Sequence, residues 1–210
     1  MSNLWNYWWL DGKQIVPMMH KDEIKLFIKY LEKCTNYLEY GSGGSTIFAL
    51  LHPNIKKIVT VETNKEWYQK IIQYNVVRKG KDRIQMELID LQCIWWKYVS
   101  WSNENNDITS VMNDNWYIYQ KIGTHMDFVP DLVLIDGRFR VACMLQLYDV
   151  VNEHSIILFD DYTSREQYNV VELFYEPIES VETLQVLKKK KEIDRNLLEE
   201  YKEKYKNCID

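Results

Sequence analysis

The chain has 210 residues, of which 46% are hydrophobic and 27% are charged, a composition that supplies a normal core and argues against global disorder. Its net charge of −5 provides no basic surface of the kind that nucleic-acid binding requires. The sequence has no run of 18 apolar residues and no signal-peptide pattern at its start. We therefore expect one domain over residues 1–210, with neither nucleic acid nor a membrane as partner.

The cysteines support a cytoplasmic location. They are far apart in the sequence, and they form no Cys-x-x-Cys pair and have no adjacent histidine: Cys34, Cys93, Cys143 and Cys208. This spacing favours free thiols in a reducing compartment over a disulfide framework or a zinc site.

Strand and helix signals alternate along the chain from residue 20 to about residue 175. Apolar periodicity predicts helices over 20–34, from Ser45 to near Pro53, over 64–80 and over 140–151. Runs of β-branched and apolar residues predict strands at 36–41, 56–62, 83–90, 130–137, 154–162 and 181–189. This alternation predicts an α/β fold with a doubly wound, mostly parallel, Rossmann-like sheet and right-handed crossovers.

Three segments are predicted to lie outside this alternation. Residues 1–19 form an N-terminal arm or lid, and residues 188–210 form a charged C-terminal helix whose solvated face carries the lysines of 188–191. Residues 92–129 are too long and irregular for an ordinary connection, so we interpret them as a Trp-rich insert or cap.

The stretch YLEYGSGGSTIFAL, residues 37–50, contains three of the seven glycines of the chain at its turn from strand to helix. Such a turn brings bare backbone close to a ligand. A phosphate-binding Walker loop would need a lysine here, and a dinucleotide fingerprint would need a small residue where Thr46 stands. The carboxylate of Glu39 would also repel a pyrophosphate.

Acidic residues end the first three predicted strands. Glu39 suits a ligand with a cationic group, and Glu62 follows it by 23 residues, at the spacing at which doubly wound folds bind ribose hydroxyls. Asp90 ends the third strand, where the edge of a base could be read. Together these features describe a nucleoside with a small charged appendage, and S-adenosylmethionine fits that description.

Over roughly residues 18–175 the sequence resembles the class I S-adenosylmethionine-dependent methyltransferases. The stretches LEYGSGG, VTVE and LID are similar to the first three motifs of that family, although the last glycine is shifted by one place. The resemblance implies that S-adenosylmethionine is bound by Glu39, Gly41, Ser42, Gly43, Gly44, Ser45, Glu62, Asp90 and Asp136.

Three further acids follow the fourth and fifth predicted strands, in IDGRFR and LFDDY. Asp136, Asp160 and Asp161 would repel each other at one sheet edge unless a cation such as Mg²⁺ or Mn²⁺ lay between them. The pattern resembles the metal-dependent sugar O-methyltransferases. That resemblance implies a divalent metal that stabilises a sugar alkoxide as methyl acceptor.

The general base is left open by the sequence. Some sugar-modifying relatives carry an acid two residues beyond the first metal-site aspartate, where this chain has Arg138. Asp161 and His20 are then the alternative bases, and Asp136, Asp161, His20 and Arg138 form the predicted catalytic set. The predicted substrate-binding residues are Arg140, Tyr162 and Arg165, and ring stacking on a ligand is a further hypothesis for Trp95, Trp96 and Trp101.

The composition, with IDGRFRVAC and DDYTSREQYNVVE, also resembles small methyltransferases of large DNA viruses of algae. That resemblance implies a sugar or glycan acceptor such as rhamnose, and a host-cytoplasmic location. Three alternatives stay open: a metal-independent methyltransferase for another small molecule, an NAD-type oxidoreductase and a non-catalytic binding module. A homodimer is also left open.

Overall fold

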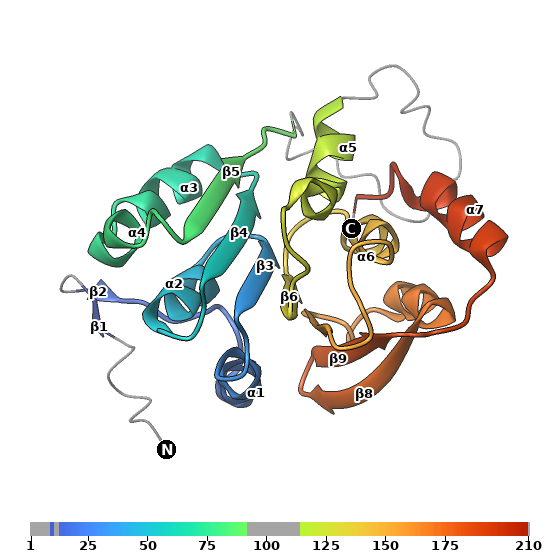
Figure 1. Ribbon diagram of the computed structural model, residues 1–210, viewed down its shortest axis with the longest axis horizontal. Helices are drawn as coiled ribbons and strands as arrows, with labels where there is room; N and C mark the ends of the chain where they lie inside the picture. The colour runs from blue at the N-terminus through green and yellow to red at the C-terminus, as the bar shows by residue number, and fades with distance from the viewer. Residues whose placement is uncertain (1–8, 11–12, 92–113, 210) are drawn as a thin grey trace.

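The computed structural model describes residues 9–10, 13–91 and 114–209. Seven strands form one sheet in the spatial order β5-β4-β3-β6-β7-β9-β8 (Figure 1). Their bounds are β3 Asn36–Tyr40, β4 Lys57–Glu62, β5 Ile84–Leu88, β6 Leu132–Ile135, β7 Ile156–Phe159, β8 Tyr175–Val181 and β9 Leu184–Lys189. The first five strands in this order are parallel, and β9 and β8 complete the sheet as an antiparallel hairpin. The predicted doubly wound, mostly parallel sheet is confirmed.

Helices cover both faces of this sheet and create two cores (Figure 1). The helices on one face are α1 Lys21–Leu31, α2 Gly44–Leu51, α3 Lys65–Ile72 and α4 Asn75–Lys79. The other face is covered by α5 Asp114–Gln120, η2 Ile122–His125, α6 Arg140–Leu147, η3 Glu166–Leu173 and α7 Arg195–Tyr205. A separate antiparallel pair, β1 Trp9–Leu10 and β2 Lys13–Gln14, precedes them.

The position of β3 and β6 decides where a ligand can bind. These parallel neighbours belong to opposite halves of the winding, and Tyr40 at the end of β3 is in register with Ile135 at the end of β6. The turns that follow them therefore lie at the same sheet edge. In doubly wound folds this reversal of strand order opens a crevice at the carboxyl ends of the strands.

Several element boundaries differ from the sequence prediction. The helix predicted over 64–80 is divided into α3 and α4, because Tyr74 leaves the helix and packs against the core. Tyr119 and Ile122, which belong to the segment predicted to be an insert or cap, are buried in the core beside α6. Within 92–129, only residues 114–129 lie in the described part of the chain.

The C-terminal region also differs from the prediction. Strand β8 was missed because it is an edge strand with exposed polar residues, interrupted by Pro177 and a bulge. Lys188 and Lys189 belong to β9, so the helix predicted from 188 is wrong at its start. Helix α7 begins at Arg195, where the Asp194 carboxylate accepts the first free amide hydrogens.

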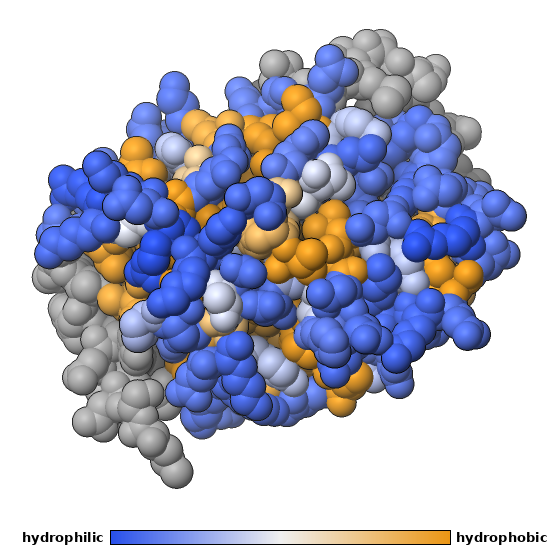
Figure 2. Space-filling model, viewed as in Figure 1, coloured by the Kyte–Doolittle hydropathy of each residue, from blue (hydrophilic) through white to orange (hydrophobic). Residues whose placement is uncertain are grey.

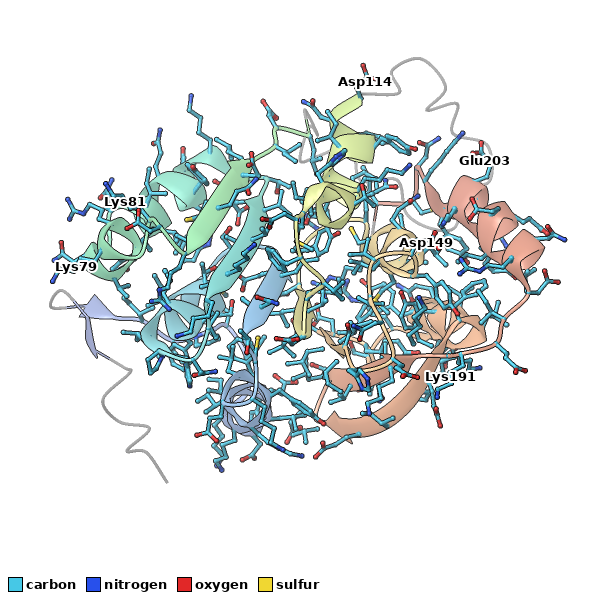
Figure 3. All side chains as sticks on the ribbon, viewed as in Figure 1. Lys79, Lys81, Asp114, Asp149, Lys191 and Glu203 are labelled. Atoms are coloured by element: carbon cyan, nitrogen blue, oxygen red, sulfur yellow. The ribbon has the colours of Figure 1, made fainter. Side chains whose placement is uncertain are left out.

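The surface agrees with the charged composition. The face drawn in Figure 2 is largely hydrophilic, with hydrophobic side chains gathered near its centre. Charged side chains such as Lys79, Lys81 and Glu203 project away from the ribbon (Figure 3). None of the helices in the described ranges is both long and apolar enough to cross a membrane.

Candidate functional site

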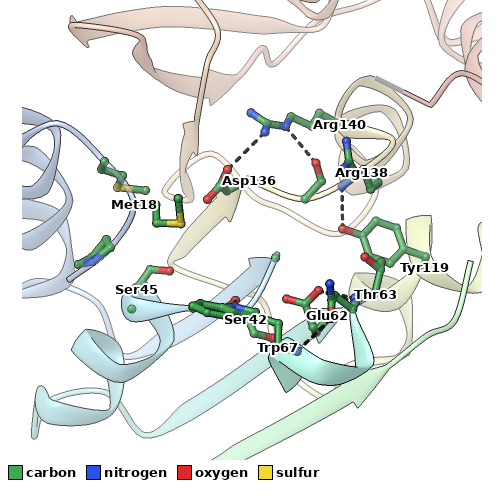
Figure 4. A pocket seen from close by; sticks show the side chains of 17 residues that line it. Met18, Ser42, Ser45, Glu62, Thr63, Trp67, Tyr119, Asp136, Arg138 and Arg140 are labelled. Atoms are coloured by element: carbon green, nitrogen blue, oxygen red, sulfur yellow. Dashed lines mark hydrogen bonds and ion pairs between the residues drawn. The ribbon is translucent and has the colours of Figure 1, made fainter. Parts of the chain in front are cut away.

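A cavity of about 290 Å³ opens at the carboxyl ends of β3, β4 and β6, at the reversal of strand order (Figure 4). Four backbone segments and three single side chains form its wall. They are 17–19, 41–45, 62–64 and 136–138, together with Trp67, Tyr119 and Arg140. Asp136, Arg138 and Arg140 lie on one side of the cavity, and Ser42, Glu62 and Trp67 lie across from them (Figure 4).

The glycine turn is fixed by close backbone contacts on two sides. Gly41 has φ +96°, and a Cβ atom there would lie 2.9 Å from the carbonyl oxygen of Asp136. A Cβ atom on Gly44 would lie 2.5 Å from the backbone of Val16 and Pro17. A Cβ atom on Gly43 would make only van der Waals contacts at 3.9 Å, with Ser45 Oγ and Trp67 Nε1, and Gly43 lines the cavity. The clustered glycines therefore serve both packing and ligand access.

Glu39 supports this turn from beneath and does not line the cavity, which corrects its predicted contact with a ligand cation. Its buried carboxylate accepts hydrogen bonds from the hydroxyls of Tyr37 at 3.2 Å, of Thr60 at 3.1 Å and of Thr46. The Thr46 hydroxyl also accepts a hydrogen bond from the Gly43 amide at 2.9 Å. Burial raises the pKa of Glu39 to about 7, although these hydrogen bonds favour the charged form. Thr46 thus connects the buried acid to the turn.

Glu62 lies where the ribose acid was predicted. One carboxylate oxygen, Oε1, accepts hydrogen bonds from the amides of Thr63 at 2.7 Å and Asn64 at 2.8 Å. These bonds fix the side chain at the cavity wall (Figure 4). Burial raises its pKa, and the amide donors oppose that shift. The arrangement presents a positioned hydrogen-bond acceptor to a ligand.

Two aromatic residues of the cavity were missed in the sequence. The Trp67 indole donates a hydrogen bond to the Ser42 carbonyl at 2.6 Å, and its position in the first turn of α3 after Glu62 was the available signal. The Tyr119 hydroxyl accepts a hydrogen bond from the Arg138 amide at 3.0 Å. No sequence signal pointed to Tyr119, because it belongs to a segment that was interpreted as an insert.

The turn between β6 and α6 contains a residue with left-handed backbone. This residue, Phe139, has φ +53°, an uncommon conformation for a bulky side chain, and it is fully buried. Asp136, Arg138 and Arg140 all line the cavity. Burial, and next the charge of Asp160, raise the pKa of Asp136 to about 9.

The predicted metal ligands do not form a metal site, which corrects that expectation. Arg140 lies among the three aspartates, with Nη1 3.2 Å from Asp161 Oδ2 and Nη2 3.3 Å from Asp136 Oδ1. Its Nη1 also donates to the Asp160 carbonyl at 2.6 Å. In the described residues, the three ligand-type side chains that bring their atoms within 4.8 Å are instead His20 and Asp22 at the start of α1 and Glu182 in the turn between β8 and β9. In this arrangement, Arg140 occupies the position that a divalent ion would take among Asp136, Asp160 and Asp161.

Asp161, Arg165 and Tyr162 do not line the cavity. Asp161 lies between two guanidinium groups, because Arg165 Nη2 approaches its Oδ2 at 2.9 Å. Tyr162 is buried, donates to Glu172 at 2.9 Å and packs on Phe159. Arg165 and Tyr162 thus make structural contacts in place of their predicted substrate contacts.

His20 and Asp90 also lie outside the cavity wall. His20 caps α1: its Nδ1 accepts a hydrogen bond from the Asp22 amide, and its own amide donates to Glu23 at 2.7 Å. The predicted role of His20 as a general base stays a prediction, since its side chain does not line the cavity in this structure. Asp90 is exposed, and its carbonyl accepts from Asn115 at 2.7 Å. Trp95, Trp96 and Trp101 lie outside the described residues.

Several solved structures with a similar architecture are described as methyltransferases or methyltransferase-like proteins. A methyltransferase-like protein from Silicibacter pomeroyi superimposes with a TM-score of 0.69 at 22% identity, covering 91% of this chain and 97% of its own. The N-methyltransferase NodS from Bradyrhizobium japonicum gives a TM-score of 0.52 at 10% identity, over 80% and 95% of the two chains. The S-adenosylhomocysteine-bound methyltransferase PaMTH1 from Podospora anserina gives 0.50 at 12% identity, over 82% and 80%.

These similarities establish the fold. The chain has the Rossmann-like fold of the class I methyltransferases, with β8 and β9 as the antiparallel end of the sheet. No protein-family model and no curated protein sequence matches the chain.

Proposed function

We propose that the protein is an S-adenosylmethionine-dependent methyltransferase that acts on a hydroxyl group of a small molecule, a sugar hydroxyl in particular. The observation that carries this proposal is the composition of the cavity wall. Glycine-turn backbone and the Glu62 carboxylate form one side, and Asp136 with two arginines forms the other. One side suits a nucleoside and the other suits a polar acceptor.

The residues of the first side fit the cofactor. The backbone of Gly43 lines the cavity without a side chain, so a ligand can approach it closely, and Glu62 offers a carboxylate acceptor to ribose hydroxyls. The indole of Trp67, fixed by its bond to Ser42, closes this side of the cavity. S-adenosylmethionine supplies, when bound, a methyl group on a positively charged sulfur.

The second side suits an uncharged acceptor hydroxyl. Asp136 is the aspartate of the predicted catalytic set that reaches the cavity, so its carboxylate is the proposed acceptor of the hydroxyl proton. Because the pKa of Asp136 is raised to about 9, this charged form becomes abundant only toward alkaline pH, and methyl transfer should increase in that direction. Arg138 also faces the cavity and can donate hydrogen bonds to neighbouring sugar hydroxyls. Asp161 and His20 lie elsewhere, which favours Asp136 over both as the base.

The sugar acceptor is supported by the polar lining and by the sequence resemblance described above. The Arg140 contacts favour the metal-independent alternative over the metal-assisted one. An NAD-type oxidoreductase is disfavoured because Thr46, where the dinucleotide fingerprint needs a small residue, is used to hold Glu39 and the Gly43 amide.

Thermal unfolding with S-adenosylmethionine, S-adenosylhomocysteine and NAD tests the proposal. A ligand present at 100 times its dissociation constant stabilises by about 2.7 kcal/mol, a readily measured shift. Stabilisation by both S-adenosyl compounds, followed by transfer of a labelled methyl group to a rhamnose-containing acceptor, is the expected result. Stabilisation by NAD alone would contradict the proposal.

A further inference from the structure

The acceptor edge of the cavity concentrates three carboxyl groups around a single arginine side chain. Asp136 ends β6, and Asp160 and Asp161 follow the neighbouring strand β7. The side chains of Asp160 and Arg140 are about 10% and 9% exposed, so water screens their charges poorly. The raised pKa of Asp136 relieves part of this repulsion with a proton, and the described structure also supplies a cation, the Arg140 guanidinium.

Arg140 is held on several sides in this position. Besides its contacts with Asp136 and Asp161, its Nε donates to the Gly137 carbonyl at 3.1 Å and its Nη1 donates to the Asp160 carbonyl at 2.6 Å. The left-handed Phe139 precedes it and turns the chain so that α6 begins with this residue. A guanidinium stays protonated in proteins, so the charge at this position is permanent.

A divalent ion would need the same space. Mg²⁺ binds oxygens at about 2.0–2.1 Å in an octahedron, so the oxygens that share an ion lie within about 4 Å of each other. Asp136 and Asp160 contact each other through their carboxyl groups, but the three aspartates do not bring three oxygens within 4.8 Å of one another, because the Arg140 guanidinium contacts both Asp136 and Asp161. An ion placed there would also be repelled by the guanidinium at close range.

We propose that the Arg140 guanidinium is the built-in cation of this edge: it holds Asp136, Asp160 and Asp161 in place, and the site binds no Mg²⁺ or Mn²⁺. Arg140 is then a positioning residue that orients Asp136 toward the cavity. The role of this edge in binding an acceptor rests on the proposed methyltransferase function. The competition between the guanidinium and a metal ion does not.

This proposal is tested by a titration of the full chain with Mn²⁺, in which electron paramagnetic resonance measures the concentration of the free ion. All proteins carry His20→Ala, because the exposed His20, Asp22 and Glu182 group could bind Mn²⁺ on its own. With Arg140 intact, we expect the ion to remain free at equimolar concentration. With Arg140→Ala, three carboxylates lose their cation, and we expect one Mn²⁺ to bind at least tenfold more tightly. Adding Asp160→Asn should abolish that gain.

Arg83→Ala is the matched control. Arg83 is also partly buried and donates to the carbonyls of Leu50, His52 and Ile55, with no carboxylate among these partners. Its removal should lower stability without creating an ion site. If Arg140 only stabilises the fold, Arg140→Ala and Arg83→Ala should both lower stability and neither should gain Mn²⁺ binding.

Two results would overturn the proposal. One is stoichiometric Mn²⁺ binding with Arg140 intact that Asp160→Asn removes, and the other is a folded Arg140→Ala protein that gains no Mn²⁺. If Arg140→Ala fails to fold, the titration of the Arg140-containing protein decides alone, since one bound ion contradicts the proposal and none supports it. Calorimetry with S-adenosylhomocysteine separates the two proposals, because absence of that binding would contradict the function and leave the Mn²⁺ result unaffected.

Discussion

The Tyr119 hydroxyl lies 1.9 Å from the position that a Cβ atom on Gly137 would occupy. Position 137 therefore has no room for a side chain, because the Tyr119 hydroxyl from α5 occupies that space beside the turn after β6. The same hydroxyl accepts the Arg138 amide hydrogen, so it fixes the segment that presents Asp136 and Arg138 to the cavity. A residue from outside the predicted motifs thus determines the shape of the acceptor side.

This contact predicts the effect of Gly137→Ala. The added methyl group must displace the Tyr119 ring, which is fully buried against Tyr40 and Phe139. We expect a loss of about 1–3 kcal/mol of stability, the usual cost of overpacking, together with weaker binding of S-adenosylhomocysteine. Chemical denaturation and calorimetry measure the two effects.

Tyr119→Phe provides the control for this prediction. It removes the hydroxyl, so Gly137→Ala should cost less in the Tyr119→Phe background than in the parent protein. The difference is the coupling energy of the two residues. Equal costs in the two backgrounds would show that the hydroxyl and the glycine do not compete for space.

Glu62→Gln tests the ribose acid. The amide oxygen of glutamine can still accept from the Thr63 and Asn64 amides, so the local fold should persist. The loss of negative charge should weaken S-adenosylhomocysteine binding by about 1–3 kcal/mol, the scale for a charge-assisted hydrogen bond. Calorimetry measures the change. Glu87→Gln on the neighbouring strand β5 is the control, and an equal loss in both variants would assign the effect to general charge.

The pH dependence of stability tests the buried Glu39. Its pKa is raised to about 7 in the folded protein, so the folded state keeps this proton after the unfolded state, with a pKa near 4.5, has lost it. The stabilisation is therefore complete below about pH 4.5 and is lost as the pH rises to about 7. We expect Glu39→Gln to reduce the decline in unfolding free energy between pH 5 and 7, by up to about 1.4 kcal/mol per pH unit.

Urea denaturation across pH 5 to 9 measures this decline. Asp136 provides the comparison, because its pKa is raised from 3.8 to about 9, so its contribution is lost over a range that includes the Glu39 range and extends to about pH 9. Asp136→Asn should therefore flatten the dependence between pH 7 and 9, where Glu39→Gln has little effect. Identical pH profiles for the parent and Glu39→Gln proteins would contradict the raised pKa of Glu39.

The fold was predictable because its signals are local. The apolar run LVLI at β6 directly indicates a buried strand. The glycines after β3 directly indicate a turn in which side chains do not fit. They sufficed for the parallel sheet and for the placement of Glu62 and Asp136 in one cavity. The edge strand β8 was missed because its exposed residues carry no such pattern.

The roles of several acids were not predictable from local patterns. Glu39 was expected to meet a ligand, yet the hydroxyls that bind it come from β3, α2 and β4. Asp136, Asp160 and Asp161 were expected to bind a metal, yet Arg140 lies between them. A sequence indicates which acids end strands. It does not indicate which cation their side chains meet after the chain has folded.

Asp136→Asn tests the proposed general base. Asparagine keeps the size of the side chain and can still accept a hydrogen bond from Arg140 Nη2, which lies 3.3 Å from Asp136 Oδ1. It cannot take a proton from the acceptor hydroxyl, so methyl transfer should slow by roughly 10²–10⁴-fold. Binding of S-adenosylhomocysteine should change little, because the glycine turn and Glu62 lie on the other side of the cavity.

Asp161→Asn is the comparison, since that carboxylate contacts Arg140 and Arg165 and does not line the cavity. Its effect on methyl transfer should be smaller. A larger loss from Asp161→Asn than from Asp136→Asn would move the base to Asp161 and require the cavity to reopen toward β7 when the acceptor binds.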